Sequence, residues 1–188
     1  MRVWGFRGAA ALLIVLGLGG LTGCGSISMP FFGKKAEKPA TPACPVAVIL
    51  HPLANTATFN VSGGDIKPLN VTWYGIFSDI SVSCTLSGNT LHASLDNIIV
   101  AERGPAIRGN DVDFDYFVAL TAGNQTILGK KPFAVHVTVP SASKRAGVND
   151  HVEVAFDTGG HPVSDLNITV GFQQSPQAIE FYKHFRGR

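Results

Sequence analysis

Short runs in which apolar and polar residues alternate cover most of the chain after Cys44, and they constrain the fold more than any other feature. Successive side chains of a strand point to opposite faces of a sheet, so a period of two predicts strands with one buried face. Turn residues such as Ser87-Gly88-Asn89 separate the runs. The runs are residues 46–50, 58–61, 69–74, 80–84, 91–100, 112–120, 126–128, 133–139, 152–156 and 168–172.

The gaps between these runs are too short for the crossover helices that a parallel sheet requires. Eight or nine short strands at spacings of roughly ten residues are typical of all-β proteins. We therefore predict an antiparallel β-sandwich of the immunoglobulin-like or fibronectin-like type over residues 44–188. A small β-barrel is the alternative fold.

A helical period replaces the alternation near the C-terminus. Ser175-Pro176 has the form of an N-cap followed by proline at the first helical position. The apolar residues that follow form one stripe at helical spacing: Ala178, Ile179, Tyr182 and Phe185. We predict a short C-terminal helix whose apolar stripe packs on one end of the sandwich. The alternative is that this stripe binds a partner.

The first 24 residues have a composition of their own. Arg2 and Arg7 precede an uncharged, mostly apolar run over residues 8–20, which is shorter than the ~20 residues that span a bilayer. The run ends in the sequence LTGC at residues 21–24. A branched apolar residue, two small residues and a cysteine look like the lipobox of bacterial lipoproteins. The Cys24 thiol is the nearest soft nucleophile, so it can take a thioether-linked diacylglycerol.

We therefore predict a lipoprotein signal peptide over residues 1–23, cleavage before Cys24 and acylation of Cys24, including a palmitate-type chain. Three acyl chains exceed the two anchors needed for stable residence in a membrane. Gly25 replaces the Asp that retains enteric lipoproteins at the inner membrane, so we expect an outer-membrane anchor facing the periplasm. The alternatives are the inner membrane, an ordinary secretory signal cleaved near Gly23, and an uncleaved anchor.

The segment that follows the anchor is predicted to be a linker. Residues 25–43 are rich in Pro, Ala, Ser, Gly and Lys and show no period, so residues 24–43 are assigned to the lipidated cysteine and a flexible tether. The chain has 15 Lys+Arg and 13 Asp+Glu. Loss of Arg2 and Arg7 with the leader would balance these charges, and a balanced surface argues against non-specific nucleic-acid binding.

Cys44 and Cys84 are the two cysteines that remain once Cys24 is acylated. The periplasm is oxidising, so we predict a structural disulfide that closes a loop of about 40 residues and stabilises the fold by roughly 4 kcal/mol. Two buried free thiols or a redox pair are the alternatives, although the chain has no CxxC motif.

Two groups of acidic and histidine residues are candidate metal sites. Asp111, Asp113 and Asp115 alternate, so they share one strand face that could gather Ca²⁺ if a loop supplied further oxygens. A solvated face is the favoured interpretation. A second group lacks the spacing of a zinc site: Asp150, His151, Glu153 and His161. No G-x-S-x-G elbow occurs, and neither acidic group has the spacing of a metal site. We predict no catalytic residue, no metal or cofactor, and no enzymatic activity.

A charged loop is expected after the strand that ends at Ala101. It reads ERGP at residues 102–105 and continues to Arg108. Charged residues on loops that a rigid sheet holds in place often bind a partner. Glu102, Arg103 and Arg108 are therefore candidate partner-binding residues, and a solvent-exposed turn is the alternative.

Several short motifs carry a resemblance to a known group. They are LTGC at 21–24, Cys44-Pro45, AERGP at 101–105, YFVA at 116–119 and GFQQ at 171–174, followed by Pro176-Gln177. On these motifs the chain resembles small proteobacterial envelope lipoproteins of unassigned function. The resemblance implies a lipoprotein, but it lends no activity and no catalytic residues.

The function expected from the anchor, the tether and the lack of a reactive motif is binding or scaffolding in the bacterial cell envelope. The expected partners are the bilayer, through acylated Cys24, and an envelope protein. The alternatives are a ligand- or metal-binding envelope lipoprotein and an envelope hydrolase. A hydrolase would need acidic or histidine side chains that converge in a cleft.

Overall fold

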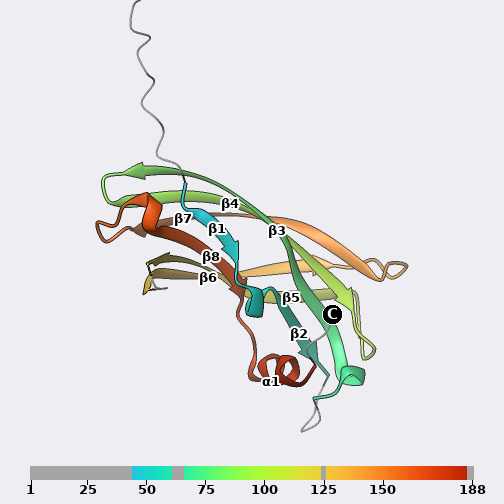
Figure 1. Ribbon diagram of the computed structural model, residues 1–188. Helices are drawn as coiled ribbons and strands as arrows, with labels where there is room; N and C mark the ends of the chain where they lie inside the picture. The colour runs from blue at the N-terminus through green and yellow to red at the C-terminus, as the bar shows by residue number, and fades with distance from the viewer. Residues whose placement is uncertain (1–43, 61–65, 124–125, 186–188) are drawn as a thin grey trace, which may run out of the picture. The chain divides into compact units, whose positions relative to one another are not determined.

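The computed structural model describes residues 44–60, 66–123 and 126–185, and it confirms the predicted all-β sandwich-like fold. Cys24 and the predicted signal peptide and linker lie outside the described residues. Within them, two four-stranded sheets have the orders β1-β8-β5-β6 and β2-β3-β4-β7 (Figure 1). The strands are β1 (Val46–Ile49), β2 (Asn55–Phe59), β3 (Val71–Ser87), β4 (Thr90–Arg103), β5 (Asp111–Ala122), β6 (Thr126–Thr138), β7 (Arg145–Asp157) and β8 (Leu166–Phe172). The finer immunoglobulin-like assignment stays a prediction.

One strand pair departs from the expected antiparallel arrangement. β1 runs parallel to β8, with Val46 opposite Asn167 and Ile49 opposite Val170. A parallel pair needs a long connection, and here the connection is supplied by all the strands between β1 and β8. The described segment therefore begins and ends its sandwich on neighbouring strands, and the remaining pairs are antiparallel.

The strands are longer than the sequence pattern predicts. β3 joins two predicted runs into one strand, because a register shift between Phe77 and Asp79 accommodates an extra residue. Before the shift, Trp73 and Phe77 point into the core, and after it Ile80 and Val82 do so. Such a bulge changes which parity of residue faces the core, so one bulged strand reads as two separate runs.

The main hydrophobic core lies between the two sheets. Leu91, Leu95 and Ile99 of β4 are almost fully buried against Ile168 and Phe172 of β8 and their neighbours in one cluster. This burial on alternate residues is what the period of two predicts. The outward-facing residues of β4 and β7 are polar at many positions, and they form an exposed surface of this sheet.

The predicted C-terminal helix is confirmed as α1 (Pro176–His184). The Ser175 side chain accepts a hydrogen bond from the Ala178 backbone N–H at 3.1 Å, and proline follows the cap as expected. The helix packs on β2 through Phe181, whose ring lies 5.4 Å from that of Phe59. The predicted stripe was partly wrong, because Phe181 is the buried anchor while Ile179 is exposed. No helix in the described part of the chain is long and apolar enough to cross a membrane.

Candidate functional site

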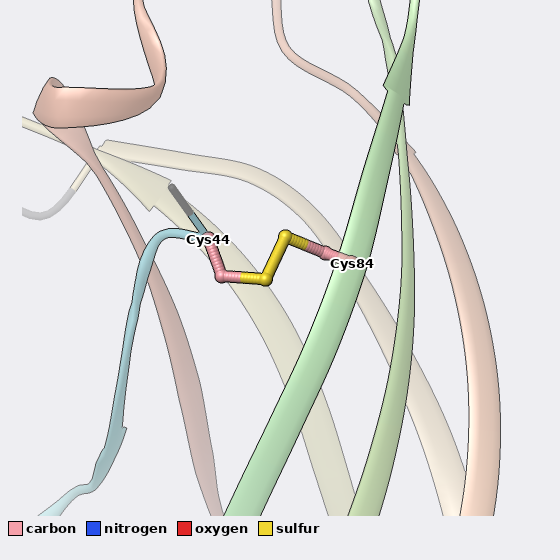
Figure 2. Close-up of a disulfide and its surroundings, with 2 residues drawn as sticks. All are labelled: Cys44 and Cys84. Carbon is pink, nitrogen blue, oxygen red and sulfur yellow. A yellow bond between two sulfur atoms is a disulfide. The ribbon is translucent and has the colours of Figure 1, made fainter. Parts of the chain in front are cut away.

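The predicted disulfide between Cys44 and Cys84 is present (Figure 2). Cys44 lies just before β1 in one sheet, and Cys84 lies on β3 in the other. Their Cα atoms are 5.6 Å apart and 40 residues apart in sequence. The bond therefore links the two sheets at the start of the domain, and a loop of this length corresponds to about 4 kcal/mol in the chain-entropy model.

Arg103 of the candidate partner-binding loop is committed to contacts within the chain. Its guanidinium donates four hydrogen bonds, to the Ser143, Gly109 and Val139 carbonyls and to Asn110 Oδ1, at 2.7–3.0 Å. It also lies 5.2 Å from the Trp73 ring centroid. This side chain fastens the loop after β4 to the loop after β6, so its visible role is structural.

The other two residues of that loop sit differently. Arg108 is exposed at the tip, whereas Glu102 is half-buried and lies between Tyr74 of β3 and Arg145 of β7 in the sheet register. Gly104 fixes the entry to the loop, because a Cβ there would lie 2.2 Å from the Val71 carbonyl oxygen. The three predicted residues thus do not form one exposed cluster, and Arg108 is the one that faces solvent.

The acidic stripe on β5 is solvent-exposed and has a histidine partner. His136 Nδ1 lies 2.8 Å from Asp113 Oδ1, and His136 Nε2 lies 3.6 Å from Asp111 Oδ1. Thr138 donates a hydrogen bond to Asp111 at 2.7 Å. The hydrogen bond to Asp113, aided by the charges of both carboxylates, raises the pKa of His136. Asp111 and Asp113 are therefore paired with protein groups, and Asp115 is the next exposed residue of the stripe.

The acidic and histidine group near residue 150 is divided between two faces. Asp150 points inward and accepts a hydrogen bond from the Tyr116 phenol, while Asn97 donates to the Asp150 carbonyl at 3.4 Å. Burial first, and then the hydrogen bond and charge of Asp150, raises the pKa of Tyr116 far above its ordinary value. Asn97 Oδ1 is buried without a hydrogen-bond partner among the described residues.

His151 and Glu153 instead face outward on β7, next to outward-facing residues of β4 and β3. A shallow groove of about 540 Å³ lies beside Glu153 and is lined by residues of β3, β4, β6 and β7. Its side chains are mostly polar and include hydroxyls, an imidazole, a carboxylate and an ammonium group. They come from Ser83, Thr85, His92, Ser94, Lys131 and Glu153.

Ser94 of this groove also belongs to a chain of hydrogen bonds among three polar side chains, which the register of β4 and β7 brings together. Asp96 is directly opposite His151 in the register, and Ser94 lies two residues before Asp96 on the same face of β4. His151 Nδ1 lies 3.0 Å from Asp96 Oδ1, and His151 Nε2 lies 3.3 Å from Ser94 Oγ. Sequence reasoning missed this arrangement, because the pairing of β4 with β7 cannot be read from either strand alone.

No group of three or more His, Cys, Asp or Glu residues that could hold a metal ion occurs within residues 44–60, 66–123 and 126–185. Comparison with protein-family models, with curated proteins and with solved structures finds no match to this chain.

Proposed function

We propose that this protein is a lipid-anchored β-sandwich of the bacterial envelope that faces the periplasm and binds or scaffolds an envelope protein. The anchor would be Cys24 in the LTGC sequence at residues 21–24, and the signal peptide would be residues 1–23. A tether over residues 25–43 would give the sandwich domain reach from the outer-membrane surface.

The observation that carries this proposal is the Cys44–Cys84 disulfide. Disulfides of this kind persist in oxidising compartments such as the bacterial periplasm and are rare in the cytosol. The bond involves two of the three cysteines in the chain, which leaves Cys24 as the one available for acylation. The cysteine chemistry is therefore consistent with export followed by attachment to lipid.

Metabolic labelling with an alkyne-bearing palmitate tests the anchor. In a bacterium that processes lipoproteins, we expect the full chain to take up the label and to require detergent for extraction. The Cys24→Ala variant should lose both properties, whereas the Cys44→Ser/Cys84→Ser double variant should keep the label. A labelled Cys24→Ala variant would contradict the proposal.

A photo-cross-linking amino acid at Arg108 tests the binding role, because this residue is exposed on a loop whose base Arg103 holds in place. We expect a discrete adduct with an envelope protein in native membranes. The same amino acid at Asp115, an exposed position on a strand of the other sheet, is the matched control. Equal or absent adducts at the two positions would count against a partner site on this loop.

A further inference from the structure

Ser94, His151 and Asp96 have the connectivity of a nucleophile, a base and an orienting carboxylate. The Asp96 carboxylate can only accept a hydrogen bond when ionised, so it selects the His151 tautomer with the proton on Nδ1. That tautomer leaves Nε2 as an acceptor, and Ser94 Oγ lies 3.3 Å from it. A hydroxyl placed in this way can transfer its proton to the imidazole as it attacks.

The two strands that carry these residues make the arrangement rigid. β4 is paired along both edges, with β3 and with β7, and runs beside β7 through this region (Figure 1). The His151 and Asp96 side chains are each about half exposed, at 55% and 48%. Reagents in solution can therefore reach Ser94 Oγ, which lines the open groove.

We propose that Ser94 is an activated nucleophile that accepts an acyl group from reactive esters, with His151 as its general base and Asp96 as a positioning residue. Ser94 Oγ attacks the carbonyl carbon and forms the new C–O bond, and its proton passes to His151 Nε2. The ester C–O bond breaks, and the leaving alkoxide takes that proton and departs as the alcohol. The product is an O-acyl serine, a function separate from membrane anchoring or partner binding.

The same geometry limits the reaction to reactive donors. The backbone N–H groups around Ser94 are engaged in the ladders to β3 and β7, so they are not directed at a developing oxyanion. Removing oxyanion stabilisation costs about 10²–10³ in rate in enzymes that use it. Activated esters and phosphonyl fluorides are therefore the expected donors, rather than amides, and the adduct should accumulate rather than turn over rapidly.

Labelling with a fluorescent fluorophosphonate tests the proposal on the full chain purified in non-ionic detergent. The reagent forms a bond from Ser94 Oγ to phosphorus and releases fluoride, and peptide mass spectrometry locates the adduct. We expect the adduct on Ser94 and its loss in Ser94→Ala. Ser83→Ala is the matched control, because Ser83 lies directly opposite Ser94 in the same groove and has no histidine partner among the described residues.

Two further variants separate activation from mere exposure. General-base catalysis is worth about 10²–10⁴ in rate, so His151→Ala should slow labelling at least tenfold, and added imidazole should restore part of it. Asp96→Ala should also slow labelling, while Asp96→Glu, which keeps a carboxylate, should recover part of the rate. Circular dichroism confirms that each variant remains folded.

The result that would overturn the proposal is labelling of Ser94 no faster than that of Ser83, or a rate that His151→Ala leaves unchanged. Absence of any adduct on the folded parent chain would overturn it equally. None of these outcomes bears on acylation of Cys24 or on cross-linking at Arg108, so the inference and the proposed function fail independently.

Discussion

Replacement of Arg103 by alanine should destabilise the domain strongly, although the sequence suggested that this residue serves a partner. The substitution removes all four hydrogen bonds of the guanidinium and its contact with the Trp73 ring. Two of those bonds, to the Ser143 and Val139 carbonyls, are partly buried. The loops after β4 and β6 would then lose their common fastening.

The expected loss is about 3 kcal/mol of unfolding free energy. A hydrogen bond to a charged group contributes about 1.5–3 kcal/mol, which applies mainly to the two partly buried bonds. The two exposed bonds contribute less because water replaces them, and the contact with Trp73 adds about 0.5–1 kcal/mol. Arg103→Lys should recover little of the loss, because an ammonium group cannot supply the planar fork of donors.

Urea unfolding followed by Trp fluorescence measures this effect, since Trp73 lies beneath the guanidinium. The chain has two Trp residues, and Trp4 lies in the proposed signal peptide, so a Trp4→Phe background ensures that Trp73 alone reports even in unprocessed chain. With an m-value of about 2 kcal/mol per molar urea, the midpoint should fall by about 1.5 M. Arg108→Ala is the control, because that exposed side chain should change stability by less than about 0.5 kcal/mol. Equal midpoints for the Arg103→Ala and Arg108→Ala variants would refute the structural role of Arg103.

Two titratable groups give further expectations. Tyr116→Phe should cost about 1–3 kcal/mol at neutral pH, because Asp150 loses the donor that its inward-facing side chain binds. Because the pKa of Tyr116 is raised, the native state keeps a phenol proton that the unfolded chain loses above about pH 10. The free energy of unfolding of the parent should therefore fall at alkaline pH, and that of Tyr116→Phe should fall less. Denaturant titrations at several pH values measure both. His136 should titrate above 6.5 by NMR, and Asp113→Asn should lower its pKa. The raised pKa of His136 contributes stability that is present below about pH 6.5 and is lost as pH rises through the pKa of the folded state. An unchanged His136 titration midpoint in Asp113→Asn would contradict the ion pair.

The fold could be predicted from the sequence because burial on alternate residues is a local pattern. The positions of Leu91, Leu95 and Ile99 identify the buried face of β4 from the sequence of that strand alone. The cap at Ser175 is equally local, since its partner is three residues away. What local patterns do not contain is a bulge, and the register shift near Phe77 therefore divided one strand into two predicted runs.

The candidate site depends on relations between strands, and these are set by the whole fold. The sequence suggests that Arg103 is a solvent-exposed charge on a loop. Two of its acceptors, the Val139 and Ser143 carbonyls, lie about 36–40 residues further along the chain and cannot be recognised from the sequence. Ser94 and His151 are 57 residues apart. No spacing rule connects such residues, so the sequence could supply the chemical groups but not their neighbours.

Asp150 and His151 show that the site depends on the pairing register of the strands to within one residue. They are adjacent in one polar group of the sequence, yet the period of two directs Asp150 inward to Tyr116 and His151 outward to Asp96. A slip of one residue in the pairing of β4 with β7 would exchange the faces and separate His151 from both Ser94 and Asp96. The partly buried hydrogen bond between Tyr116 and Asp150 opposes such a slip, because Asp150 must face inward to meet the phenol. The inward polar contact thus fixes the register on which the outward Ser94–His151–Asp96 arrangement depends.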